Sequence, residues 1–328
     1  MTSIPFIPHP WLHGPHRMTL IPRLWPRENF PAGMPTQNRI FQVTPESALL
    51  TKCHWQIFPS KHLTVLIVHG LEGCTESHYM QGLAQKAWQA GWNSIRINQR
   101  NCGGSEHLAP TLYHNGLSQD YLSILQEITE RDKCQNLWLV GYSMGGNLIL
   151  KLAGELGSSF PALRGVVAVC PNIHPATCVL ALQYPSNWIY HQYFLKSLKA
   201  TLRKKSLLYP GKWDISRLSR IRTMWEFDEA YTAPDGGFRD AADYYEKSAA
   251  GNVLSSISIP TLIITSQDDP FIPYDIFTEP ALYSNPWIQM MAPAHGGHCG
   301  FFQRFCSGED HFWAENRIID FIRIHEKT

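Results

Sequence analysis

The sequence has almost no net charge, no long apolar run and no recognisable leader. Its 28 basic and 27 acidic side chains give a formal charge of +1, so nothing global attracts nucleic acid, and we expect no nucleic-acid partner. No apolar segment approaches the roughly 18 residues of a transmembrane helix. The first ten residues have no basic start followed by an apolar run, and we predict no secretory signal.

The eight cysteines have no C-x-x-C pair and no regular spacing, which argues against a zinc site or a disulfide framework. We therefore expect reduced thiols and a cytoplasmic location. There is no P-loop and no G-x-G-x-x-G after a predicted strand, so we expect no cofactor. We predict no metal either: His9, His13 and His16 lie close together, but Pro10 and Pro15 break any helix that could align their rings.

A pattern of alternating strands and helices begins at about residue 40. With 44% hydrophobic and 17% charged residues, the chain is long enough for one large domain with an insertion or for two ordinary domains. The pattern predicts an entry hairpin at 39–43 and 49–58, strands at 63–68, 92–98, 137–140, 165–170, 260–265 and 287–291, and helices at 78–90, 117–131 and 311–325. This indicates an α/β fold whose mainly parallel central sheet is covered by helices on both faces.

Two segments depart from this pattern. Residues 1–38 are rich in proline, histidine and tryptophan, and we predict that they form an N-terminal surface arm. Residues 39–328 form the predicted catalytic domain. Between about 171 and 259 the strands stop, and we predict a helical lid insertion there, because loops at the carboxyl edge of such a sheet overhang its site.

The pentapeptide Gly-Tyr-Ser-Met-Gly at 141–145 stands between an apolar strand and a helix-like segment. This context is typical of a nucleophile elbow, in which Ser143 occupies a strained strand-to-helix turn. Gly141 and Gly145 are required sterically, because a Cβ there would collide with the neighbouring backbone. The motif alone arises by chance in a chain of this length with a probability on the order of 0.1, so a base and an acid must also be found.

The serine needs a histidine base, and His298 lies in a glycine-rich loop after the last predicted strand. His295 is the alternative, but His298 is nearer the closing helix and lies among more glycines. The acid should follow the penultimate strand, where Asp269 matches the usual Asp-x-apolar-x-Pro arrangement. We expect Asp268 to cap the turn instead. The other place used for the acid in this fold reads Pro-Asn at 171–172 and offers no carboxylate.

Two backbone N–H groups must face the developing oxyanion. Met144 follows the nucleophile and supplies one. The second is expected from the His-Gly-Leu-Glu-Gly loop at 69–73, after an apolar strand, and Leu71 is the predicted donor.

Six motifs occur in order along the chain: His-Gly-Leu-Glu-Gly at 69–73, Arg-Asn-Cys-Gly-Gly-Ser at 100–105, Gly-Tyr-Ser-Met-Gly-Gly at 141–146, Phe-Asp-Glu-Ala-Tyr-Thr-Ala-Pro at 227–234, Asp-Asp-Pro at 268–270 and Gly-Gly-His at 296–298. Together they resemble the YheT-like branch of the α/β-hydrolases, which includes bacterial esterases and eukaryotic acylglycerol lipases of the abhydrolase type. The resemblance spans about residues 10–325. It implies Ser143, Asp269 and His298 as triad, with Leu71 and Met144 at the oxyanion hole. Asn101 departs from the small residue expected in its turn.

Other chemistry-bearing residues have simpler interpretations. Cys74, Cys102 and Cys299 lie near the predicted site, and we interpret them as spectator thiols. In the insertion, we expect the acids at 228–229 to have a structural rather than a catalytic role, which pairing with arginines such as Arg222 or Arg239 would provide.

The segment 188–208 has apolar residues at every fourth position and a run of lysines and arginines without an intervening acid. It predicts a basic amphipathic helix. Packing over the site with a solvated outer face is one interpretation, and peripheral contact with an anionic membrane is the other.

These residues predict a serine hydrolase that cleaves carboxylic esters, with short-chain acyl or lipid esters as substrates. A thioesterase or an amidase would use the same triad, and a non-catalytic lipid-binding protein on this scaffold is a further alternative. A structural Ser143 on an inactive scaffold would correspond to that last case.

Overall fold

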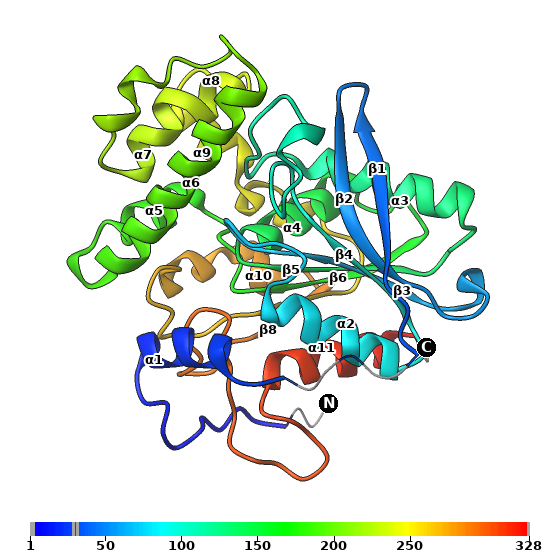
Figure 1. Cartoon of the computed structure of the whole chain (residues 1–328). Helices are drawn as coiled ribbons and strands as arrows, with labels where there is room; N and C mark the ends of the chain where they lie inside the picture. The colour runs from blue at the N-terminus through cyan, green and yellow to red at the C-terminus, as the bar shows by residue number, and fades with distance from the viewer. Residues whose placement is uncertain (1–3, 28–29, 31–32, 327–328) are drawn as a thin grey trace.

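The computed structural model describes residues 4–27, 30 and 33–326 of the chain. Within them, eight strands form one sheet in the order β1-β2-β4-β3-β5-β6-β7-β8 (Figure 1). The strands are β1 (Gln37–Thr44), β2 (Ser47–His54), β3 (Thr64–Val68), β4 (Asn93–Ile97), β5 (Leu137–Tyr142), β6 (Leu163–Val169), β7 (Thr261–Ile264) and β8 (Ile288–Met291). The first hairpin joins the sheet antiparallel, and all later pairs are parallel. The predicted hairpin and strands are thus confirmed, with ends that differ by a few residues.

The central strands are buried along their whole length because both faces of the sheet are covered. In β3, Leu66 and Val68 pack into one hydrophobic cluster, whereas Val65 and Ile67 pack into a second cluster on the opposite face. Successive side chains of a strand point to opposite faces of the sheet, which produces this alternation. It explains why the run is apolar at every position rather than at every other one.

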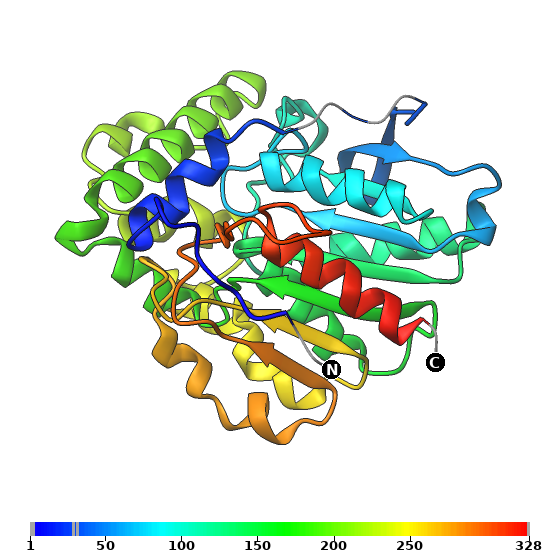
Figure 2. The same ribbon diagram turned by 90° about the horizontal axis from the view of Figure 1, so that it is seen from below.

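Helices cover both faces, as predicted. The pair α2 (His78–Gln89) and α11 (Trp313–His325) packs on one face, and α3 (Ser118–Arg131) with α4 (Met144–Leu156) packs on the other (Figure 2). Three short connecting elements, η2 (Pro59–Lys61), η3 (Glu106–Leu108) and η8 (Tyr274–Thr278), and the short helix α10 (Pro280–Ser284) complete the domain outside its insertion.

The predicted helical insertion follows β6 and returns to β7, and Figure 1 shows its helices gathered beyond one end of the sheet. Its long helix is α6 (Trp188–Leu208), which confirms the predicted helix, and its inward face buries Tyr190, Leu198 and Leu202. The other elements are α5 (Pro175–Leu182), η4 (Pro185–Asn187), η5 (Ile215–Ser219), α7 (Met224–Phe227), η6 (Asp228–Thr232), α8 (Ala233–Asp235), α9 (Ala241–Ser248) and η7 (Ala250–Ser256). The domain boundaries at 38, 171 and 259 stay predictions.

The N-terminal segment carries α1 (Pro15–Leu20) and η1 (Ile21–Leu24) and lies against the loop that precedes α11 (Figure 2). Leu12 and Met18 form a small hydrophobic cluster with Phe302 and Phe312. The clustered N-terminal histidines enter separate contacts: the His9 ring packs among aromatic rings, and the His16 ring stacks on Tyr190.

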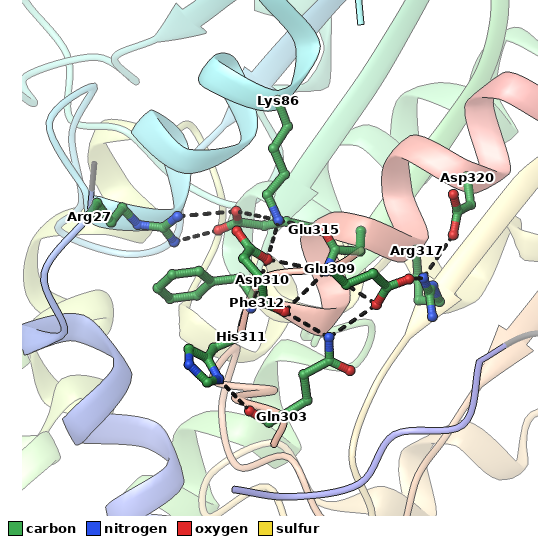
Figure 3. Close-up of polar contacts among 11 residues, drawn as sticks. Arg27, Lys86, Gln303, Glu309, Asp310, His311, Phe312, Glu315, Arg317 and Asp320 are labelled. Carbon is green, nitrogen blue, oxygen red and sulfur yellow. Dashed lines mark hydrogen bonds and ion pairs between the residues drawn. The ribbon is translucent and has the colours of Figure 1, made fainter. Parts of the chain in front are cut away.

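An ion-pair network fastens the same segment to α2 and α11 (Figure 3). Arg27 Nη2 lies 2.5 Å from Glu315 Oε1 on α11, and Lys86 Nζ on α2 lies 2.7 Å from Asp310 Oδ1. Gly82 makes room for the pair of Arg27 and Glu315, since a Cβ on Gly82 would come within 1.8 Å of Arg27 Nη1. The end of the N-terminal segment is therefore held by buried charge as well as by apolar packing.

Among the described residues, no helix is both long enough and apolar enough to cross a membrane.

Candidate active site

Ser143 makes the whole turn between β5 and α4, because β5 ends at Tyr142 and α4 begins at Met144. Its backbone has φ 55° and ψ −119°, a strained conformation for a residue with a side chain. The flanking glycines permit the turn. A Cβ on Gly141 would come within 2.3 Å of the Gly145 carbonyl oxygen, and one on Gly145 within 2.5 Å of the Val68 carbonyl oxygen. The steric reason predicted for both glycines is thus found in the backbone.

His298 and Asp269 form a buried pair. Their Nδ1 and Oδ2 atoms are 2.7 Å apart, and the other carboxylate oxygen accepts the backbone N–H groups of Phe271 at 3.1 Å and Ile272 at 3.0 Å. Burial by itself would lower the pKa of His298, but the charge and hydrogen bond of Asp269, with smaller contributions from Cys170, outweigh it and raise that pKa to about 9. Asp269 therefore fixes the ring and favours the imidazolium.

The loop around His298 packs against the N-terminal segment and is hydrogen-bonded to it. The His298 backbone N–H donates to Thr19 Oγ1 at 2.8 Å, and Ser266 Oγ donates to the Gly297 carbonyl at 2.9 Å. Gly297 has φ 56°, and a Cβ there would come within 2.7 Å of the Pro15 carbonyl oxygen. A glycine is needed at this position both for its backbone angle and for the close approach of α1.

The alternative residues, His295 and Asp268, pair with each other at the surface. The His295 side chain is 64% exposed, and its Nδ1 lies 3.3 Å from Asp268 Oδ2. Asp268 Oδ1 accepts the Gly297 N–H at 2.9 Å. The expectation that Asp268 caps its own turn is wrong: Asp269 caps it through Phe271 and Ile272, and Asp268 instead ties this turn to the histidine loop.

The predicted oxyanion donors flank the serine. Met144 is the first residue of α4, so its N–H has no acceptor within the helix. Leu71 follows Gly70, whose position is so close to the nucleophile that a Cβ there would lie 3.0 Å from Ser143 Cβ. The loop and the elbow therefore approach as two N–H donors around one oxyanion require.

Two cavities meet at Ser143 and Leu71. The outer cavity, of about 420 Å³, is lined by Ser143, His298 and Leu71, by Thr19 and Arg23 of the N-terminal segment, and by aromatic residues of α6. The inner pocket, of about 70 Å³, is lined by Ser143, Met144 and Leu71 and continues along residues of the insertion. Ser143 thus faces a large cavity and a small pocket.

The loop at 69–73, which contains the predicted donor Leu71, is held by residues that the sequence did not indicate. Glu72 has φ 55°, and its carboxylate accepts hydrogen bonds from Tyr113, from Ser197 and, at 3.5 Å, from Thr201. The motif at 69–73 draws attention to Glu72. Its three partners come from distant segments, and no local pattern in the sequence indicates them.

Among the described residues, Cys170, His298 and Cys299 are the set whose side chains could hold a metal ion. Their ligand atoms lie within 4.8 Å of one another. Burial raises the pKa of the Cys170 thiol well above its usual range, which favours the neutral thiol and agrees with a spectator role. All eight cysteines are free.

The expected pairing of Asp228 and Glu229 with Arg222 or Arg239 is wrong. Asp228 Oδ2 accepts the Tyr245 hydroxyl at 2.6 Å, and Glu229 accepts the Ala241 N–H at 2.8 Å. Arg239 pairs with the adjacent Asp240 instead, and Arg222 donates to the Ser219 carbonyl. Asp228 thus accepts from a hydroxyl and Glu229 from a backbone N–H, and neither pairs with an arginine among the described residues.

Several cations of α6 have partners within the protein. Lys199 donates to the Ile221 carbonyl, Lys204 pairs with Glu106 at 2.6 Å, and Lys205 is buried against the Ala109 carbonyl. The exposed side of the helix carries Trp188, Ile189 and Tyr193 beside the exposed Lys196 and Arg203. Its outer face is therefore more apolar than the sequence predicts, and part of its basic charge is paired within the protein.

The Asn101 backbone explains the departure at its turn. Its φ is 67°, a left-handed conformation in which glycine is most common and asparagine is the side chain best tolerated. Asn101 Nδ2 also donates to the Thr111 carbonyl at 2.9 Å. Asparagine therefore replaces the expected small residue without changing the turn.

Comparison with known proteins places this geometry among hydrolases. A family model described as alpha/beta hydrolase fold matches residues 64–305. The chain is 31% identical over 327 residues to the protein named "Putative esterase YheT" of Escherichia coli (strain K12), a match that covers 98% of this chain and 94% of that protein.

More distant relatives share part of their length or the fold alone. Phospholipase ABHD3 of Mus musculus is 26% identical over 241 residues, which cover 73% of this chain and 58% of that protein; the chain thus spans under two thirds of that relative. The solved structure of the Pyrococcus furiosus esterase Pf2001 has a TM-score of 0.59 at 14% identity and covers 98% of both chains.

Proposed function

This chain belongs to the α/β-hydrolase fold family and is a carboxylic ester hydrolase, and from that premise we propose that it cleaves short-chain acyl or lipid esters through an acyl-enzyme on Ser143. The observation that carries the proposal is the buried pair of His298 and Asp269, at 2.7 Å, beside the cavity that also contains the strained Ser143. A base that is held by a carboxylate and shares a cavity with a serine is the arrangement that nucleophilic acyl transfer requires.

The proposed reaction has two halves. Ser143 Oγ attacks the ester carbonyl carbon while His298 Nε2 accepts its proton, and the N–H groups of Leu71 and Met144 stabilise the oxyanion. Collapse of the intermediate breaks the bond to the alcohol, which leaves with the proton from His298. Water then attacks the acyl-enzyme with His298 again as base, which releases the acid and restores Ser143.

The two cavities suggest where the halves of the substrate lie. We assign the acyl group to the inner pocket, because Met144, an oxyanion donor, and apolar residues such as Val179 and Leu182 line it. The larger outer cavity then takes the alcohol. Its volume of about 420 Å³ allows a bulky leaving group such as a glycerol or lipid moiety.

Labelling with a fluorophosphonate tests the nucleophile. Only an activated serine reacts quickly, so we expect rapid labelling of the wild type and none of Ser143→Ala. Equal labelling of the two proteins would refute the enzyme mechanism and leave the lipid-binding alternative. A series of p-nitrophenyl esters of increasing chain length, assayed with wild type and His298→Ala, then measures the acyl preference. Matched thioesters and anilides in the same assay separate an esterase from a thioesterase or an amidase.

Membrane contact through residues 188–208 and a cytoplasmic location stay predictions. The internal partners of Lys199, Lys204 and Lys205 favour contact through exposed apolar side chains over binding by charge. Flotation with neutral and anionic liposomes decides between them: recovery only with anionic vesicles supports the electrostatic form, and no recovery with either removes the idea. Cell fractionation would test the compartment.

A further inference from the structure

One buried acid in the inner pocket has no role in the proposed reaction. Asp228 lines the same pocket as Ser143, and it comes from η6 of the insertion, in the Phe-Asp-Glu motif that the catalytic machinery does not use. The side chain reaches a cavity that is otherwise lined largely by apolar and aromatic groups such as Leu182, Leu198 and Met224. A carboxylate in such a place is costly unless something compensates its charge.

Among the described residues, the groups found to donate hydrogen bonds to the Asp228 carboxylate are hydroxyls. It is 7% exposed, Tyr245 Oη donates to Oδ2 at 2.6 Å, and the Thr232 hydroxyl also contacts the carboxylate. None of the ion pairs found among the described residues includes Asp228. A carboxylate offers about four acceptor positions, so two hydroxyl groups leave acceptor capacity toward the pocket.

The backbone around Asp228 is unusual as well. Residues Asp228–Thr232 form a single π-helical turn, a rare conformation that occurs mostly at functional sites. The turn directs both Asp228 and Thr232 to the pocket. A second acceptor is found in the same lining, because Asn172 Oδ1 is buried without a hydrogen-bond partner among the described residues.

We propose that Asp228 is a specificity-determining residue, which accepts a hydrogen bond from a hydroxyl or ammonium group on the acyl part of the ester. This inference rests on the proposed function and deepens it by naming the substrate class: esters whose acyl chain carries a hydrogen-bond donor. Asn172 Oδ1 offers the donor a second acceptor. The apolar walls hold the methylene groups between that donor and the carbonyl.

The test compares matched esters. We would measure kcat/KM for p-nitrophenyl hexanoate and octanoate and for their terminal hydroxyl and terminal ammonium derivatives. With the wild type at pH 8, we expect one of the donor-bearing esters to react at least about tenfold faster than the unsubstituted ester of the same length, the range typical of one hydrogen bond to a charged group. A higher rate for the hydroxyl ester indicates a neutral donor, and a higher rate for the ammonium ester indicates a cation.

The variants assign the preference to Asp228. Asp228→Asn should cancel a preference for ammonium and reduce a preference for hydroxyl, mainly through KM, while the rate with unsubstituted esters changes by less than about threefold. Asp243→Asn, on α9 of the same insertion, is the matched control and should keep the wild-type ratio. Tyr245→Phe removes one internal donor and keeps the acid, so the preference should increase. A purely structural Asp228 would change thermal stability and leave the ratio unaltered.

The outcomes separate this inference from the proposed function. If the wild type cleaves unsubstituted esters and prefers them at both lengths, the role of Asp228 is refuted and the serine mechanism stands. If fluorophosphonate does not label Ser143 and no ester is cleaved, the proposed serine mechanism and the role of Asp228 are both refuted. Should Asp228→Asn fail to fold, the wild type and Tyr245→Phe ratios still decide the question.

Discussion

Tyr113 Oη lies 2.5 Å from Glu72 Oε1 and 3.0 Å from the Glu72 backbone nitrogen, so a single phenol holds both the side chain and the backbone of Glu72. Burial, reinforced by the Glu72 charge, raises the pKa of Tyr113 well above its usual range, which keeps the hydroxyl protonated. The other carboxylate oxygen is bonded by Ser197 on α6. Glu72 therefore links the loop of the proposed oxyanion donor Leu71 to the insertion.

We predict that Glu72→Ala lowers kcat by about tenfold to a hundredfold with little change in KM. Without the carboxylate, the strained loop loses its hydrogen bonds from Tyr113 and Ser197 and keeps only backbone contacts such as that of the Glu72 N–H with Tyr113. The Leu71 N–H is then aimed less well, and complete loss of such a donor costs roughly 100- to 1,000-fold. Glu72→Gln keeps an acceptor for Tyr113 and should recover most of kcat. A change in KM alone would show that Glu72 acts on substrate binding. Steady-state kinetics on one p-nitrophenyl ester measures all three proteins.

The activity should rise with pH well into the alkaline range. The pKa of His298 is raised to about 9, and the base must be neutral to accept the Ser143 proton. At pH 7 only about one molecule in a hundred then carries a neutral imidazole, so kcat/KM should increase roughly tenfold per pH unit from pH 6 to 8, reach half its maximum near pH 9 and level off about one pH unit higher. A pH profile of kcat/KM measures this, and a plateau already reached at pH 7 contradicts it.

Asp269→Asn provides the control for that profile. Since the charge of Asp269 raises the pKa of His298, its removal should move the midpoint to lower pH, and loss of ring orientation should reduce the plateau by up to roughly 10⁴-fold. The raised pKa of His298 also makes the stability of the fold depend on pH. The stabilisation from the charged pair is fully present below the unfolded histidine value of about 6.5 and is lost as the pH rises through about 9.

The sheet and the elbow were predictable because their signals are local. A buried parallel strand is apolar at every position, as in β3 and β5, and the turn at Ser143 requires glycines at fixed offsets. The partners of the site residues were not predictable in this way. Thr19 reaches the His298 N–H from the other end of the chain, and the choice between Asp268 and Asp269 as turn cap depends on where the histidine loop lies. Asp228 was misassigned because sequence proximity to arginines does not predict tertiary pairing.

Zinc should inhibit the enzyme by binding Cys170, Cys299 and His298, whose ligand atoms lie within 4.8 Å of one another. Two sulfurs and an imidazole nitrogen are ligands that Zn²⁺ prefers, and they bind it at about 2.3 Å and about 2.0 Å. Atoms that lie within 4.8 Å of one another can surround one ion after small movements, and the bound base can no longer accept a proton. We expect micromolar Zn²⁺ to inhibit reversibly and a chelator to restore activity. Cys299→Ser should weaken inhibition by at least about tenfold, with Cys306→Ser as control. Equal inhibition of both variants contradicts this site, and competition with a zinc-binding dye measures the affinity directly.

Gly82→Ala should both destabilise the protein and reduce its activity. The new Cβ would come within 1.8 Å of Arg27 Nη1 and 2.7 Å of Glu315 Oε2. The arginine must withdraw and leave Glu315, whose side chain is only 4% exposed, without its closest partner. Complete loss of a buried ion pair costs about 3–5 kcal/mol, which is the upper limit here because the flexible arginine tip can move aside and Lys86 stays 3.5 Å from Glu315. The gain from replacing glycine in a helix is up to about 1 kcal/mol.

The activity should fall with the stability because the same N-terminal segment carries Thr19, the acceptor of the His298 N–H. When the segment loosens at Arg27, the histidine loop loses a fixed contact and the base is positioned less well for Ser143. Urea unfolding measures the first effect and kcat the second, with Glu130→Gln, an exposed position on α3, as control. A variant that loses stability but keeps the wild-type kcat would show that the N-terminal segment supports the fold without positioning the base.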